Sequence, residues 1–140
     1  MSRWVFKSNR FDWAALLGGA SSIQYTGRAE GRGGETLSSV SPGNVGLAYQ
    51  VEDRSFHGIV RVLSVQSTAR PAYVTIARVH RFARPVRLAD LIAKFPLLAD
   101  VDAFTTGSAT DTMRRLRPDE FRMIVEGCGV DAVQRERMKI

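Results

Sequence analysis

The first hydrophobic block of the chain, residues 4–6, runs directly into a polar block at residues 7–9. The bulky Trp, Val and Phe of the first block favour a β-strand. Asp12 is a suitable N-cap for a short helix that extends through Leu17, and the glycines at 18–19 would end it. A strand that ends in hydrogen-bonding groups beside a helix is suited to form a pocket wall, although an ordinary first strand and turn has the same pattern.

Further along, residues 21–26 are predicted to form a short strand, and the turn signal at 41–44 precedes another strand at 45–51. In 45–51 every second residue is bulky and apolar, which is the alternation of a strand with two distinct faces. Its second face is small or polar, as expected of a wall that faces a ligand. The residues of that face are Gly46, Ala48 and Gln50.

Two longer strands follow at residues 56–66 and 73–82. Apolar residues occupy both faces of 56–66, so this strand is expected to be central or bulged. The apolar parity of 73–82 shifts between Ile76 and Val79, which again predicts a bulge or a barrel bend. Arg84 and Pro85 are expected to end this strand.

The helical pattern appears mainly in the last third of the chain. Apolar residues at 88–95 follow i, i+3, i+4, i+7 spacing, and Pro96 would stop that helix. Residues 97–117 are irregular, a second helix is predicted at 118–127, and the tail at 131–140 is expected to continue as a loose helix.

About five strands, short helices and several bulge signals predict an α+β fold built on a small, strongly curved mixed sheet or barrel of five to six strands. The length of 140 residues suits a single domain spanning 1–140, with the charged tail at 128–140 loosely attached.

The composition argues against several classes of protein. No apolar run approaches the roughly 18 residues of a membrane span, and the first residues lack the apolar stretch of a secretory signal, so we expect a cytoplasmic protein with no membrane partner. Cys128 is the single cysteine and there are only two histidines, which argues against a disulfide or a metal centre. The glycine-rich stretch 27–34 matches no nucleotide-binding motif, and no nucleophile motif is present. We therefore expect no catalytic activity and no cofactor.

The net charge of +6 favours an anionic partner, nucleic acid first. Seventeen of the 20 basic residues are arginine, and the stretch 54–87 contains seven arginines without any Asp or Glu. Arginine suits recognition of phosphates and base edges. A GC-rich genome would give the same preference for arginine codons over lysine codons, so both explanations stay open.

Five fragments in sequence order resemble the EVE domain, a PUA-like barrel related to the YTH domain. Each fragment is weak alone, but their order and spacing cover nearly the whole chain. The fragments are residues 4–8 (strand, then Lys-Ser), 46–50 (a strand ending at Tyr), 58–62 (Gly-Ile strand), 79–91 (strand into a Leu-x-x-Leu helix) and 116–121 (Leu-Arg-Pro-Asp-Glu-Phe).

The resemblance implies a module that binds nucleic acid without catalysis and receives a modified base in an aromatic-lined pocket. A flipped-out 5-methyl- or 5-hydroxymethylcytosine in DNA is favoured, since flipping exposes an edge that the duplex hides. The residues that would contact the base are Lys7, Ser8, Asn9, Trp13, Gln24, Tyr25, Tyr49, Gln50, Thr105 and Thr106. The residues that would contact the nucleic-acid backbone are Arg10, Arg28, Arg32, Arg54, Arg114 and Arg115.

The same resemblance leaves two settings open: one part of a modification-dependent restriction system, with a nuclease as a partner or a missing fused domain, or the sensor of a stand-alone protein. We expect the chain to be a monomer. The chain departs from the family pattern at residues 24–44 and has Gln50 where a histidine is usual. Three alternatives therefore stay open: a PUA-type module for structured or modified RNA, a protein-interaction barrel with a vestigial pocket, and an enzyme acting on a small ligand.

Overall fold

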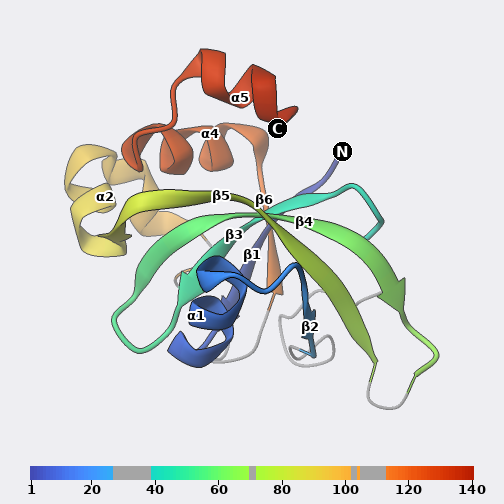
Figure 1. Cartoon of the computed structure of the whole chain (residues 1–140). Helices are drawn as coiled ribbons and strands as arrows, with labels where there is room; N and C mark the ends of the chain where they lie inside the picture. The colour runs from blue at the N-terminus through green and yellow to red at the C-terminus, as the bar shows by residue number, and fades with distance from the viewer. Residues whose placement is uncertain (27–38, 70–71, 102–103, 105–112) are drawn as a thin grey trace.

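The computed structural model describes residues 1–26, 39–69, 72–101, 104 and 113–140, which contain one six-stranded sheet (Figure 1). The strands lie in the order β2-β5-β4-β3-β1-β6. Their bounds are β1 Arg3–Ser8, β2 Ile23–Tyr25, β3 Val45–Gln50, β4 Ser55–Gln66, β5 Tyr73–Arg87 and β6 Met113–Leu116. The long strands β4 and β5 bend across the middle of the molecule, so the sheet curls into a half-barrel. The predicted α+β class with a strongly curved sheet is confirmed.

Helices cover both faces of this sheet. They are α1 (Arg10–Gly18), α2 (Leu88–Lys94), the 3-10 helix η2 (Pro96–Asp100), α4 (Pro118–Gly127) and α5 (Ala132–Met138). In Figure 1, α1 lies on one side of the sheet, and α4 and α5 lie on the other. The core divides accordingly: Trp4 of β1 packs with Trp13 of α1, whereas Val5 packs with Leu91 of α2 and Phe121 of α4. The alternating residues of β1 thus serve two separate clusters.

Bulges produce the curvature of the sheet. The pairing of β4 with β5 shifts register between Phe56 and Gly58, between Ile59 and Val60, and between Val62 and Ser64. The predicted central, bulged strand is therefore confirmed. The prediction that β5 ends at Arg84–Pro85 is wrong, because β5 continues to Arg87. Pro85 falls in the unpaired stretch of the first bulge, where its missing N–H removes no ladder hydrogen bond.

Two other details of the local predictions are corrected. Asn9, not Asp12, caps α1: the Asn9 Oδ1 accepts the Asp12 N–H at 3.0 Å, so the helix begins at Arg10. The small face of β3 is core at Gly46 and Ala48, and only Gln50, at the end of the strand, lines a hollow. Ala48 is fully buried, and a Cβ at Gly46 would collide with the ring of Phe6.

The region after η2 contains one strand that the pattern did not predict. Strand β6 pairs antiparallel with β1, placing Arg114 opposite Val5. Its sequence Met-Arg-Arg-Leu does not alternate between apolar and polar residues, so periodicity gave no signal.

The charged tail forms a helix, as expected, and has its own caps. Asp131 and Gln134 exchange the two hydrogen bonds of a capping box at the start of α5. From β4, Arg61 donates to the carbonyl oxygens of Met138, at 2.9 Å, and Lys139, at 3.2 Å. Within the described ranges, no helix is long and apolar enough to cross a membrane.

Candidate nucleic-acid interface

The parallel pair β1 and β3 ends at a single edge of the sheet. Lys7 pairs with Tyr49 and Ser8 pairs with Gln50, and the Val51 N–H donates to the Ser8 carbonyl at 2.9 Å. Helix α1 begins at this edge, directly after β1. We call the group around it the strand-end site. Its members are Lys7, Ser8, Tyr49, Gln50, Arg54 and Arg114.

Two members of the strand-end site are buried cations. Lys7 is 5% exposed and Arg114 is 8% exposed. They lie on the same face of the sheet, because Arg114 pairs with Val5, two residues before Lys7. Among the described residues, no carboxylate pairs with either side chain, and the Arg114 Nε has no hydrogen-bond partner.

This environment disfavours the charge on Lys7. Burial, with the nearby charges of Arg114 and Arg54, lowers the pKa of Lys7 to about 8. The Lys7 Nζ lies 6.0 Å from the ring centroid of Tyr49, a cation–π contact. Burial raises the pKa of Tyr49, although the charge of Arg54 acts in the opposite direction. The site thus concentrates positive potential on one face of the sheet.

The three aromatic residues predicted to stack on a base do not form one wall. Trp13 and Tyr25 lie together on the α1 side, nearly parallel at 13° with centroids 6.5 Å apart. Tyr49 belongs to the opposite core cluster, where it packs against Phe56 and Phe104. The structure therefore brings two of the three together and separates the third.

The same two aromatic residues are buried in this structure. Trp13 is 1% exposed and Tyr25 is 2% exposed. The Trp13 Nε1 donates to the carbonyl of Tyr49 at 2.9 Å, and the Tyr25 hydroxyl donates to the carbonyl of Lys7 at 2.7 Å. Trp13 and Tyr25 thereby hold the backbone of both strands that end at the strand-end site.

The predicted polar contacts are partly engaged within the protein. The Ser8 hydroxyl donates to the Asp12 carboxylate, and Asn9 caps α1. The Gln50 amide is half-buried and donates to Asp53 at 3.2 Å. Gln24 is exposed on β2, on the face opposite to its neighbour Tyr25.

The predicted backbone-binding arginines are spread over several elements. Arg10 is exposed at the start of α1 with its guanidinium 5.0 Å from the Phe11 ring, and Arg54 lies in the β3–β4 turn with φ +53°. Arg115 covers Trp4, 5.0 Å from its ring, on the face opposite to Arg114. Four predicted site residues lie outside the described part of the chain: Arg28, Arg32, Thr105 and Thr106.

A hollow of about 330 Å³ lies beside the strand-end site, between α1 and the strands β4 and β5. Residues that line it include Arg10, Trp13, Gln50, His57, Arg81 and Pro85. His57 and Arg81 were not among the predicted site residues. The run of arginines without any acidic residue from 54 to 87 was a signal for Arg81, but it did not show which side chains meet at one place, and nothing in the sequence pointed to His57.

Near the hollow, the side chains of Asp53, Ser55 and His57 are hydrogen-bonded in a row. The Ser55 Oγ lies 2.6 Å from Asp53 Oδ1 and 2.8 Å from His57 Nε2. A Ser-His-Asp nucleophile needs the histidine in the middle, whereas here the serine is in the middle and is 1% exposed. Its single proton goes to Asp53, so His57 donates to Ser55. This row is therefore not a nucleophile and base arrangement.

Comparisons with known proteins identify the fold. No protein-family model matches the chain, and no curated protein is detectably similar in sequence. Several solved structures do match. One is Atu2648 from Agrobacterium tumefaciens, with 24% identity and a TM-score of 0.71 over 92% of each chain. Another is Rpa0253 from Rhodopseudomonas palustris, with 19% identity and a TM-score of 0.72 over 92% of this chain and 94% of that one.

A third similar structure was solved with a nucleic acid. It is human THYN1 in complex with DNA containing 5-methylcytosine, with 14% identity and a TM-score of 0.73 over 94% of this chain and 99% of that one. At these identities the likeness concerns the arrangement of the elements. The chain has the PUA-like fold that the resemblance to the EVE domain implies.

Proposed function

We propose that the chain is a non-catalytic DNA-binding module that recognises a modified cytosine, received as a flipped-out base beside the strand-end site. The observation that carries the proposal is the pair of buried cations, Lys7 and Arg114, for which the described residues provide no carboxylate. Burying a charge without a counter-ion is unfavourable. A phosphate or a polar base edge at this place would supply the missing partner.

The fold gives independent support. The human THYN1 structure shows that this arrangement of strands and helices accommodates DNA with 5-methylcytosine in that protein. In our chain, the predicted Lys7-Ser8 segment lies at the end of β1, and β3 brings Gln50 beside Ser8. An amide has both a donor and an acceptor, which is what reading a base edge requires. Of the two predicted glutamines, Gln50 is the one at the strand-end site.

The buried aromatic pair changes how the proposal must be tested. Replacing Trp13 or Tyr25 by alanine would open a cavity in the core, at a cost of about 3–5 kcal/mol for a large aromatic residue. A loss of binding in those variants would report unfolding as well as a lost stacking surface. Tyr25→Phe is cleaner, because it keeps the buried ring and removes the hydroxyl that donates to the Lys7 carbonyl.

The deciding experiment compares matched duplex oligonucleotides that carry cytosine, 5-methylcytosine or 5-hydroxymethylcytosine at one position, by fluorescence anisotropy at fixed salt. We expect a modified duplex to outcompete its unmodified twin. Gln50→Ala should bring the ratio of affinities toward one, whereas Gln24→Ala, which removes the same amide from an exposed position, should leave it unchanged. Equal affinity of the natural protein for all duplexes would reject modified-base recognition.

The same assay separates the alternatives. Tighter binding of a structured RNA than of duplex DNA would favour the RNA-binding module, and absence of salt-sensitive binding to any nucleic acid would favour a protein-interaction barrel. The coupling to a nuclease in a restriction system stays a prediction of the family resemblance. Co-purification of a nuclease with the tagged protein would test it.

A further inference from the structure

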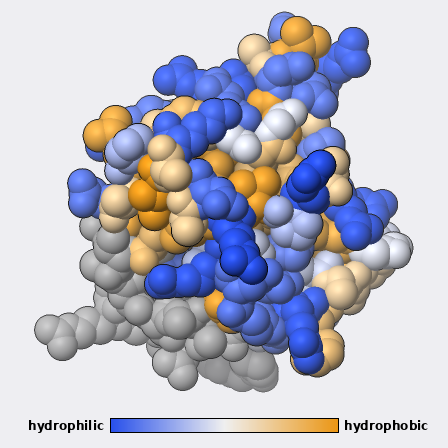
Figure 2. All heavy atoms as spheres, turned by 90° about the vertical axis from the view of Figure 1, so that its left-hand side faces the viewer, coloured by the Kyte–Doolittle hydropathy of each residue, from blue (hydrophilic) through white to orange (hydrophobic). Residues whose placement is uncertain are grey.

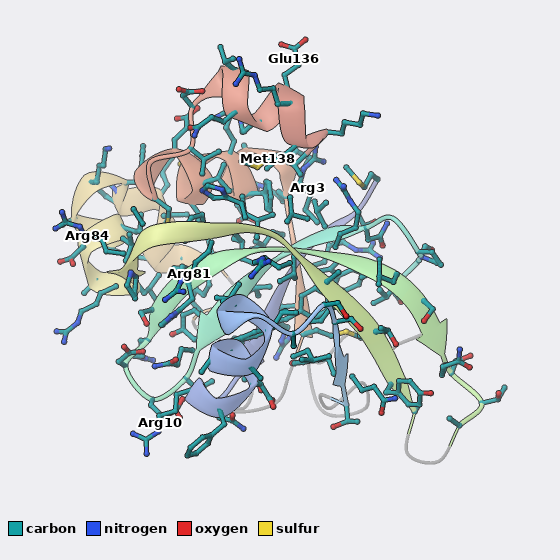
Figure 3. All side chains as sticks on the ribbon, in the orientation of Figure 1. Arg3, Arg10, Arg81, Arg84, Glu136 and Met138 are labelled. Carbon is teal, nitrogen blue, oxygen red and sulfur yellow. The ribbon has the colours of Figure 1, made fainter. Side chains whose placement is uncertain are left out.

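The hollow between α1 and the β4–β5 ladder has polar donors on three sides. Arg10 comes from α1, His57 from β4 and Arg81 from β5. The residues Trp13 and Pro85 supply the apolar part of the lining. Figure 3 shows Arg10 at the lower end of α1 and Arg81 beside β5 above it. Figure 2 shows many hydrophilic side chains on the side of the molecule that is on the left in Figure 1.

Within the described part of the chain, the arginines around the hollow form no direct ion pair with a carboxylate. Arg10 and Arg81 are both exposed to solvent. Two carboxylates close to these residues accept hydrogen bonds from uncharged groups. Glu52 accepts the backbone N–H of Arg10 at 2.9 and 3.1 Å, and Asp53 accepts the Ser55 hydroxyl and the Gln50 amide.

Strand β5 extends this positive surface beyond the hollow. It carries exposed arginines at every third position: Arg78, Arg81, Arg84 and Arg87. Among the described residues, the side chain of Arg78 alone of the four has an intramolecular hydrogen bond, which it donates to the Leu17 carbonyl at 3.3 Å. The bulges of β5 break strict alternation, which allows arginines three residues apart to share an accessible side of the strand.

From this geometry we propose that the hollow is a phosphate subsite, in which Arg10, His57 and Arg81 hold one phosphodiester of the DNA strand whose modified base is received at the strand-end site. The inference rests on the proposed function and assigns His57 and Arg81 a role in it. The hollow meets the strand-end site at Gln50, which lies on the α1 face of β3, whereas Lys7 and Arg114 lie on the opposite face of the sheet. Arg84 and Arg87, which follow on β5, would contact neighbouring phosphates of the same DNA strand.

The residues around the hollow suit a phosphodiester. The guanidinium fork binds two oxygens of a phosphate at once, and arginines from two different elements allow the anion to be held from two sides. The row from Asp53 to His57 orients the imidazole, because its Nε2–H is committed to Ser55. The Nδ1 has no hydrogen-bond partner among the described residues. Burial lowers the pKa of His57, so Nδ1 is an acceptor in the neutral ring and donates to the anion only after the ring takes up a proton on binding.

The test compares Arg81→Gln with Arg137→Gln, an equal loss of charge at an exposed position on α5. Binding to duplex DNA is titrated over a range of salt concentrations. Arg81→Gln should weaken binding about five- to tenfold and reduce the slope of log affinity against log salt by about 0.9, the value for one lost phosphate contact. Arg137→Gln should change neither, and Arg81→Lys should keep most of the slope. An unchanged slope for Arg81→Gln overturns the inference.

A second measurement locates the phosphate. A single neutral methylphosphonate linkage is moved along the strand that carries the modified cytosine. One position should weaken binding by the natural protein and have a clearly smaller effect on Arg81→Gln, because one of the partners of that phosphate is already absent. If every position weakens both proteins equally, the hollow does not hold a phosphate.

The two proposals fail in different ways. Arg81→Gln should keep the ratio between modified and unmodified duplexes, since it removes a contact that carries no sequence information. Equal affinity for both duplexes with an intact Arg81 effect would reject modified-base recognition and leave the phosphate subsite standing. If the natural protein prefers the modified duplex but Arg81→Gln binds as tightly as it does, the phosphate subsite is rejected and modified-base recognition stands.

Discussion

The two ends of the molecule treat their charged residues differently. At the α4–α5 end, Arg117 pairs with Asp119 at 2.7 Å and Arg135 pairs with Glu126 at 3.3 Å. At the strand-end site and the adjacent hollow, the described structure contains no such pair, although Asp12, Glu52 and Asp53 are all nearby. In Figure 1, α4 and α5 lie at the top and the β1–α1 junction lies below the sheet.

The comparison shows that net charge alone does not locate a binding surface. At one end, carboxylates bind guanidinium groups, so much of the positive charge is neutralised locally. At the other end, carboxylates accept backbone N–H, hydroxyl and amide hydrogens, which organises the turn and leaves the arginines available to an external anion. Among the described residues, no carboxylate pairs with the buried Lys7 and Arg114. Such an arrangement lowers stability and is expected where binding supplies the missing charge.

The largest expected effect is the salt dependence of DNA binding. With about four phosphate contacts, affinity should fall roughly 100-fold between about 50 mM and about 200 mM salt. The double variant Arg54→Gln/Arg81→Gln should flatten the slope by about 1.8, whereas Arg122→Gln/Arg137→Gln at the other end should leave it unchanged. Anisotropy titrations measure all three slopes. Equal slopes for the two double variants would remove the distinction between the ends.

The next effect concerns the stability of the free protein. Lys7→Met keeps the length of the side chain and removes a buried cation beside Arg114, so the free energy of unfolding at pH 7 should rise by about 2 kcal/mol, after allowance for solvent screening at the edge. Urea denaturation followed by circular dichroism gives this difference. DNA binding by the same variant should weaken, so stability and function should move in opposite directions.

The pH dependence of that difference has a defined sign. The folded-state pKa of Lys7, about 8, lies below the ordinary 10.5, so the unfolded chain binds the proton more readily between these values. The stability contributed by this group therefore rises from pH 8 to 10.5, and the advantage of Lys7→Met should shrink over the same interval. Raised pKa values at Tyr49 and Cys128 act in the opposite direction, but they cancel when the two proteins are compared. If the difference in the free energy of unfolding between Lys7→Met and the natural protein does not change with pH, this account of Lys7 is wrong.

A smaller effect is expected at Arg54, whose backbone has a positive φ of +53°. Arg54→Gly removes the side chain and suits this conformation, so stability should be unchanged or slightly higher. Duplex affinity should fall about fivefold through the loss of one phosphate contact. Thermal melting and anisotropy on the same preparation check both statements. A variant that binds as well as the natural protein would exclude Arg54 from the interface.

The smallest effect is expected at the α4–α5 end. Arg135→Met breaks the ion pair with Glu126 and a hydrogen bond to the Val130 carbonyl, and should cost about 0.5–1 kcal/mol of stability. DNA affinity and its salt slope should not change. A clear loss of affinity in a folded Arg135→Met protein would show that the α4–α5 end also contacts DNA.

Much of the fold could be predicted from local patterns. Alternation and capping residues predicted the strands at 45–51 and 56–66 and the helix at 118–127, because these segments bury regular apolar faces. Strand β6 was missed because two consecutive arginines replace the alternation. The length of β5 was underestimated because Pro85 is harmless only at a bulge, which depends on the partner strand.

The candidate site, like the fold, was predicted where it depends on local sequence and missed where it depends on packing. The sequence identified Lys7, Ser8 and Gln50 as polar groups at strand ends, and β1–β3 pairing brought them together. It could not determine that Trp13 and Tyr25 point into the core or that Tyr49 lies on the other face, because burial depends on which elements pack against each side.

By itself, the sequence determined the class of fold, the strand ends rich in donors and an arginine-rich stretch without acidic residues. Those features depend on local propensity and composition, which each segment carries with it. Only the tertiary structure decided which charges are neutralised. Pairing of β6 with β1 placed Arg114 near Lys7, and the curvature of β5 brought Arg81 to the hollow with His57 and Arg10. Electrostatic interaction depends on distance and burial, and both are set by contacts between segments that are far apart in the chain.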